Sequence, residues 1–164
     1  MDRSRTHWTL GAKLALMGVP FLLLGLLTTA LTLWVSWQLD GGAAAVNEAG
    51  RMRMQVYRMA WLAGKDERPA LAAQMESFDA SLALLRHGDA ERPLFMPWDD
   101  AVRMHFDAVQ SEWAAYRRQW VLPGPALAAT EGPTHQMVER IDQLVGAVEA
   151  HLSRFTALMH LSQL

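Results

Sequence analysis

Apolar positions along the chain follow two different patterns. From Leu14 to Leu39 no side chain is charged, and Leu, Trp, Phe and Val are frequent. After Asp40, apolar residues instead recur every three or four positions, which is the spacing of one face of an α-helix. The alternation typical of β-strands is absent from the sequence. The pattern therefore predicts an all-α protein in which one continuous apolar helix precedes a set of amphipathic helices.

The uncharged segment 14–39 is long enough to cross a membrane. As a helix it extends roughly 39 Å, against about 30 Å for the hydrocarbon core of a bilayer. Trp34 and Trp37 near one end and Trp8 before the other are placed as interfacial residues would be. A buried helix of a soluble protein is rarely this long, and a cleaved signal peptide has an apolar region of only about 7–15 residues. We predict an uncleaved transmembrane helix over 14–39, surrounded by membrane lipid.

The charges that flank this segment predict its orientation. The next basic residue after the segment is Arg51, whereas three basic residues precede it, namely Arg3, Arg5 and Lys13. Because positive charge is retained on the cytoplasmic side, residues 1–13 are expected in the cytoplasm and residues 40–164 outside it. In a Gram-negative bacterium this means an inner-membrane protein with residues 40–164 in the periplasm.

Four amphipathic helices are expected in residues 40–164, separated by glycine and proline. Their similar lengths and the longer connections between some of them favour an antiparallel four-helix bundle. The first continues from the apolar segment to about Ala63, the second runs from near Pro69 to Gly88, the third from Trp98 or Asp99 to Pro123, and the fourth from about Pro133 to the chain end.

Apolar residues at helical spacing predict the core. The third helix provides Val102, Phe106, Val109, Trp113, Tyr116 and Trp120, and the fourth provides Met137, Ile141, Leu144, Val148, Leu152, Phe155 and Met159. The first helix provides Ala45, Ala49, Met52, Val56, Met59 and Ala63. Met54, like Met52 and Met59, is interpreted as a packing residue and not as part of a metal or haem site.

Two further stripes run along the first helix beside its core face. The stripe Glu48, Arg51, Gln55 and Arg58 is polar and is interpreted as solvated. The other contains Val46, Gly50, Arg53, Tyr57 and Ala60, so that Arg53 is its one basic residue. A guanidinium on such a surface must be either exposed to solvent or paired, because burying it alone is costly.

The composition excludes several classes of function. A net charge of −2 gives no general attraction to nucleic acid, and the absence of cysteine excludes disulfides and cysteine-ligated zinc. The six histidines form no pair spaced by four residues, and we expect no metal or other cofactor. No glycine-rich phosphate loop, nucleophile–base spacing or kinase ATP-binding motif is present, so no catalytic residue and no enzymatic activity are expected within these residues.

The segment NEAGRMRMQVYRMA, residues 47–60, is similar to the P-box of bacterial nitrate/nitrite sensor histidine kinases, Asn-x-Ala-Gly-x-x-Arg-Met-Gln-x-Tyr-Arg. The positions that match in register are Asn47, Ala49, Gly50, Arg53, Met54, Gln55, Tyr57 and Arg58. The segment MVERIDQLVGAVE, residues 137–149, resembles the last periplasmic helix of the same family. Type IV pilus chemoreceptors carry a related sensory domain with a similar box. Arg51 and Met52 replace the serine and leucine common in the kinase family.

The resemblance implies a homodimer in which the P-box helices of two subunits face each other and hold one nitrate or nitrite ion. Arg53, Gly50 and Asn47 are then the expected ligand-binding residues, and Gly50, which lacks a side chain, permits close approach of the two helices. We expect a sensor portion of a longer histidine kinase that signals to a cytoplasmic response regulator. The alternatives are a type IV pilus-type methyl-accepting chemotaxis receptor, a scaffold bundle without a ligand, and a complete single-span protein.

Overall fold

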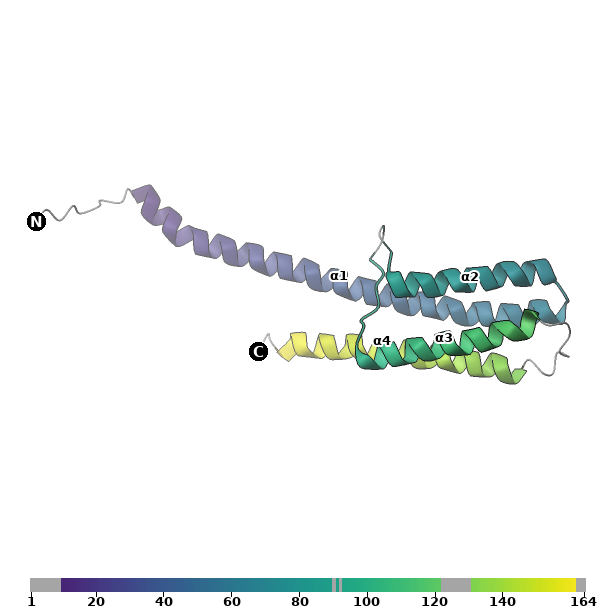
Figure 1. Ribbon diagram of the computed structural model, residues 1–164. Helices are drawn as coiled ribbons and strands as arrows, with labels where there is room; N and C mark the ends of the chain where they lie inside the picture. The colour runs from purple at the N-terminus through teal and green to yellow at the C-terminus, as the bar shows by residue number, and fades with distance from the viewer. Residues whose placement is uncertain (1–9, 90, 92, 122–130, 162–164) are drawn as a thin grey trace, which may run out of the picture. The chain divides into compact units, whose positions relative to one another are not determined.

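A computed structural model describes residues 10–89, 91, 93–121 and 131–161 (Figure 1). Within these residues the only extended pairing is an isolated bridge between Asp89 and Leu94, and no strand is formed. Four helices account for the rest of the regular structure, namely α1 (Leu10–Gly64), α2 (Arg68–His87), α3 (Asp100–Val121) and α4 (Glu131–Leu161). The predicted all-α class, a long apolar N-terminal helix followed by a helical bundle, is confirmed.

The chain divides into two compact units, Met1–Trp37 and Gln38–Leu164, and α1 contributes residues to both. We call them the N-terminal unit and the bundle unit. In the described part of the N-terminal unit, the leucine, valine, phenylalanine and methionine side chains from Leu14 to Leu33 are exposed. Among the described helices, α1 is the one that is long and apolar enough to cross a membrane, judged by length and composition.

The three threonine hydroxyls in the apolar part of α1 are satisfied within the helix. The Thr28 hydroxyl donates to the backbone carbonyl of Leu24 at 3.0 Å, and the Thr29 hydroxyl donates to that of Gly25 at 2.9 Å. The Thr32 hydroxyl donates in the same way to the Thr28 carbonyl at 2.9 Å. Hydroxyl groups that bond back to their own helix need no water, which is the arrangement that a hydrocarbon environment requires.

The bundle unit is formed by α2, α3 and α4, which lie alongside the C-terminal half of α1 (Figure 1). The predicted core positions of α3 are all buried, as are those of α1 from Ala45 to Met59 and those of α4 from Met137 to Val148. Leu152 and Ala63 are partly buried and pack against this core. Phe155 and Met159, also predicted in the core, have side chains outside the described residues.

Helix ends follow the predicted glycine and proline positions. α1 ends at Gly64, and α2 begins with Pro69 in its first turn and ends before Gly88, which has a positive φ of 76°. α4 begins at Glu131, two residues before Pro133. The predicted end of α3 at Pro123 lies outside the described residues.

One prediction for α1 is wrong for two of its four residues. Glu48 and Gln55 were expected on a solvated stripe, yet they are only 5% and 6% exposed. Arg51 and Arg58 of the same stripe are exposed. The reason is that α2 packs against the side of α1 that carries Glu48 and Gln55. Met54, interpreted as a packing residue, is 67% exposed, and no described helix covers it.

Two adjacent glycines of α1, Gly41 and Gly42, let other segments pack closely against this helix at the start of the bundle unit. A Cβ atom built on Gly41 would overlap the Phe95 ring, and one built on Gly42 would lie 2.5 Å from Leu152 of α4. The Phe95 backbone amide also donates to the Gly41 carbonyl at 3.4 Å. The glycine pair therefore lets the α2–α3 connection and the C-terminal part of α4 pack directly on the α1 backbone.

Candidate functional site

The outward face of α1 carries the residues that the P-box resemblance singled out. Asn47 and Arg53 are exposed, and Gly50 is half-buried. Large apolar side chains continue the same face at helical spacing, namely Met54, Tyr57 and Trp61, all of them exposed. Because residues 47, 50, 54, 57 and 61 alternate steps of three and four, they form one continuous stripe that the four-helix core leaves uncovered.

Arg53 lies at the edge of this stripe and is paired across the bundle. Its Nη1 donates to Oδ1 of Asp142 on α4 at 2.7 Å. Both side chains remain about half exposed, 44% for Arg53 and 49% for Asp142. The expectation that Arg53 must be exposed or paired is confirmed in both respects. An exposed ion pair of this kind contributes only about 0.2–1 kcal/mol, because water screens both charges.

Gly50 and Asn47 extend the site by about one turn toward the N-terminus. A Cβ atom on Gly50 would lie 3.7 Å from Nη2 of Arg53, an ordinary contact, so the space left by this glycine faces outward and not into the core. Asn47 makes no side-chain hydrogen bond within the described residues, and its amide is exposed. The structure thus places Asn47, Gly50 and Arg53 on one side of α1 with the Arg53 guanidinium as the charged group.

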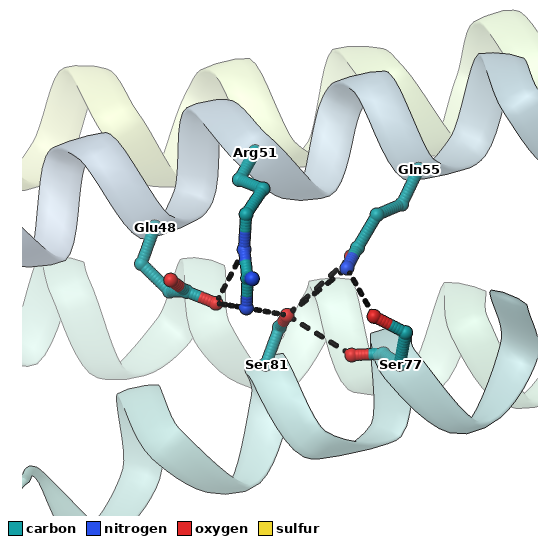
Figure 2. Close-up of polar contacts among 5 residues, drawn as sticks. All are labelled: Glu48, Arg51, Gln55, Ser77 and Ser81. Atoms are coloured by element: carbon teal, nitrogen blue, oxygen red, sulfur yellow. Dashed lines mark hydrogen bonds and ion pairs between the residues drawn. The ribbon is translucent and has the colours of Figure 1, made fainter.

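A polar network that sequence reasoning missed lies on the side of α1 that packs against α2, between the core face and the outward stripe (Figure 2). Arg51 donates to Oε1 of Glu48 through Nη2 at 2.6 Å and through Nε at 3.2 Å, and its Nη2 also donates to the Ser81 hydroxyl at 3.2 Å. The Gln55 amide donates to the hydroxyls of Ser77 at 2.9 Å and Ser81 at 3.3 Å. Two serines spaced by four residues on α2 were the signal that could have identified it.

Other polar contacts join α2 to α3. Asp79 of α2 accepts hydrogen bonds from the Trp113 indole at 2.7 Å and from Arg117, both on α3. Arg86, in the last turn of α2, donates to the side-chain carbonyl of Gln110. These contacts fix how α2 and α3 pack, since each carboxylate or amide holds its partner helix in one position.

Asp99 joins the start of α3 to α4. One oxygen accepts a hydrogen bond from the Val102 backbone amide at 2.8 Å, as a helix-capping residue does, and the other lies 2.8 Å from Nδ1 of His151. The hydrogen bond from the Val102 amide and that with His151 lower the pKa of Asp99 below its ordinary value of 3.8. Deeper in the bundle, burial raises the pKa of Tyr116, whose hydroxyl lies 3.1 Å from that of Thr134.

The described residues contain no group of three or more histidine, aspartate or glutamate side chains placed to hold a metal ion. On the outward face of α1, the Arg53 guanidinium lies beside apolar surface. A guanidinium presents paired N–H donors in a plane and recognises carboxylates and planar oxyanions.

Residues 34–160 match the protein family described as PilJ, type IV pili methyl-accepting chemotaxis transducer N-term. The match begins within the apolar part of α1 and covers the bundle unit as far as residue 160. A comparison with curated proteins gave no match. The family match agrees with the chemoreceptor alternative, and it is not a match to the nitrate/nitrite sensor kinases that the box also resembles.

Proposed function

The chain belongs to the family of type IV pilus methyl-accepting chemotaxis transducer N-terminal domains, and on this premise we propose that residues 40–164 are the periplasmic sensory domain of a membrane-anchored chemotaxis-type receptor. Residues 14–39 are its inner-membrane anchor, and residues 1–13 lie in the cytoplasm. The uncovered apolar side chains of α1 and the internally bonded threonines support the anchor. A sensor kinase that passes its signal to a response regulator is the less favoured output.

The uncovered stripe on α1 supports a homodimer as the working form of this domain. Met54, Tyr57 and Trp61 expose apolar surface at a spacing that a second α1 helix would cover. Gly50 precedes them on the same stripe and leaves room for the second backbone. A parallel arrangement of two α1 helices brings both copies of Arg53 to the edges of the interface.

The ligand that best fits this arrangement is a small planar oxyanion, nitrate or nitrite. Two guanidiniums about 8 Å apart repel each other by roughly 2 kcal/mol at an effective dielectric constant near 20. An anion about 4 Å from each is attracted by roughly 4 kcal/mol to each, before desolvation is subtracted. The observation that carries this proposal is that Arg53 is half-exposed and is held by a carboxylate, so the guanidinium is oriented and its present partner is weakly bound.

Competition between the anion and Asp142 links binding to a structural change. An anion that takes the Arg53 guanidinium releases the ion pair between α1 and α4, so the two helices are freed to shift relative to each other. Displacements of about 1–2 Å are typical of packed helices that switch between two states. The ligand biases the equilibrium only by its difference in affinity for the two states, and a tenfold difference supplies about 1.4 kcal/mol.

Nitrate titration of the full chain in lipid nanodiscs tests the site. Arg53→Ala should abolish binding, and Arg53→Lys should weaken it strongly because an ammonium lacks the planar pair of donors. Asp142→Asn should tighten binding by roughly 1.5- to 5-fold, since it removes a competitor worth about 0.2–1 kcal/mol. Arg58→Ala is the matched control, because Arg58 is exposed on the same helix.

Arg53→Ala and Asp142→Asn should change the affinity for nitrate in opposite directions, which makes the comparison decisive. If Asp142→Asn weakens nitrate binding as much as Arg53→Ala does, Asp142 is not a competitor, and the proposed link to α4 fails. If Arg58→Ala is as damaging as Arg53→Ala, the anion site lies elsewhere on α1. The sequence that follows residue 164 separates the two outputs, because a methylated coiled coil marks a receptor and a kinase core marks a sensor kinase.

A further inference from the structure

A hollow of about 340 Å³ opens on the side of the bundle where α2 and α3 meet. It is lined by Arg86 of α2, by Trp98 before α3, and by Arg103, Phe106 and Asp107 of α3. A volume of this size falls at the lower end of the range for small-molecule sites and accommodates one small ligand. None of these residues belongs to the outward face of α1.

Aromatic rings and a guanidinium form the floor of the hollow. The Trp98 and Phe106 rings meet edge to face with centroids 5.1 Å apart, and the Arg86 guanidinium carbon lies 5.4 Å from the Phe106 centroid. Phe106 is buried, whereas Trp98 stays exposed. Phe106 therefore fixes its neighbours by packing, and the apolar surface that a ligand can reach is that of the Trp98 indole.

The charges around this floor are not neutralised by one another. Arg86 donates to Gln110, a neutral acceptor, and Arg103 and Asp107 form no ion pair within the described residues although they are four positions apart on α3. The hollow thus presents two guanidiniums and one carboxylate beside an aromatic surface. The two positive charges of the arginines disfavour binding of a metal ion in the hollow, and the carboxylate of Asp107 disfavours binding of a polyanion.

We propose that this hollow binds a free α-amino acid with an apolar side chain. The ligand carboxylate is held by Arg103 and Arg86, its ammonium group by Asp107, and its side chain by the exposed Trp98 indole, which Phe106 holds in place. Each group of the ligand then meets a group of opposite charge or of matching polarity. The site lies on different helix faces from Arg53, so it does not depend on the proposed oxyanion function.

Calorimetric titration of the full chain in nanodiscs with L-phenylalanine and L-leucine tests the proposal. 3-Phenylpropionate, which lacks the ammonium group, and 2-phenylethylamine, which lacks the carboxylate, should bind at least about tenfold more weakly than L-phenylalanine. Arg103→Gln and Asp107→Asn should each weaken amino-acid binding by at least about tenfold. Arg118→Gln is the matched control, because Arg118 is exposed on α3 and does not line the hollow.

The outcomes separate this site from the one on α1. Amino-acid binding that survives Arg53→Ala and Arg118→Gln but is lost in Arg103→Gln and Asp107→Asn supports the proposal. Loss of binding in Arg53→Ala, equal binding of 3-phenylpropionate and L-phenylalanine, or no saturable binding at millimolar amino acid would each overturn it. Arg103 and Asp107, the two side chains replaced in the hollow, are exposed to solvent. Thermal unfolding of the two variants should therefore be unchanged, which checks that the fold is intact.

Discussion

Replacement of Arg51 by alanine should destabilise the bundle unit although much of the Arg51 side chain faces solvent. The Arg51 side chain is 56% exposed, but the side chain of Glu48, whose carboxylate it holds, is only 6% exposed. In Arg51→Ala the carboxylate keeps its buried position between α1 and α2 and loses its described hydrogen-bond donor. The loss of stability arises from Glu48, because its buried carboxylate cannot replace the lost hydrogen bonds with bonds to water.

The size of the effect follows from the hydrogen bonds that Arg51→Ala removes from the Glu48 carboxylate. A hydrogen bond to a charged group contributes about 1.5–3 kcal/mol, and removal of one partner of a fully buried ion pair costs about 3–5 kcal/mol. Because water reaches Arg51, we expect Arg51→Ala to lower the free energy of unfolding by about 2 kcal/mol, within the first of these two ranges. For a unit of about this size each kcal/mol shifts the melting temperature by about 4 °C, so Arg51→Ala should melt roughly 8 °C lower.

Circular dichroism melting of four variants provides the assay. Glu48→Met should restore most of the stability that Arg51→Ala removes, since an apolar side chain of similar length needs no donor. Glu48→Met alone should be mild, because Arg51 can then point into solvent. Arg58→Ala is the control for removal of an exposed arginine from α1. Equal melting temperatures for Arg51→Ala and Arg58→Ala, or no rescue by Glu48→Met, would refute the assignment of a buried pair.

Three further measurements test other parts of the structure. A reporter fused after Leu164 should be active only outside the cytoplasm, and cytoplasmic activity would reverse the proposed orientation. Asp99→Asn should lower stability above pH 4 and remove part of the acid sensitivity. The pKa of Asp99 is lowered in the folded state from 3.8, so its stabilisation is present above that value and is lost as the pH falls through the folded pKa. An unchanged acid-unfolding profile would argue against the hydrogen bonds that Asp99 forms with the Val102 amide and with His151. Gly41→Ala should destabilise the bundle unit and expose Phe95 to quenchers or proteases, because the new Cβ occupies the position of its ring; a silent Gly41→Ala would show that the ring moves freely.

Helical spacing alone was sufficient to predict most of the core. A residue such as Val109 or Ile141 is buried because it lies on the apolar face of its own helix, and that face is visible in the local sequence. The ends of α2 were also predictable, since Pro69 and Gly88 act on the backbone nearest to them. Properties that depend on one helix at a time were therefore accessible.

Properties that depend on which helix lies opposite could not be predicted from the sequence. Glu48 and Gln55 are polar, and a periodicity argument places polar residues in water. Burial is favourable here because Arg51 donates to the Glu48 carboxylate and the serines of α2 accept from the Gln55 amide. The partner of Arg53 is 89 positions away in the sequence, and no local pattern points to Asp142. The hollow beside Trp98 likewise arises from two helices and the connection between them, so its five lining residues carry no common motif.

The serine pair on α2 determines how α1 can move. The two serines are one helical turn apart, so if α2 slid along α1 by one turn, about 5.4 Å, one serine would take the place of the other, and Ala73 or Leu85 would replace the remaining hydroxyl. The buried Gln55 amide would then lose one of its two hydroxyl partners, at a cost of about 1–3 kcal/mol, so the serine pair favours one register in which α1 and α2 move together. Among the described residues of the bundle unit, a half-exposed ion pair is the polar side-chain contact between α1 and α4. An axial displacement of α1 therefore carries α2 with it and is accommodated by sliding against α4.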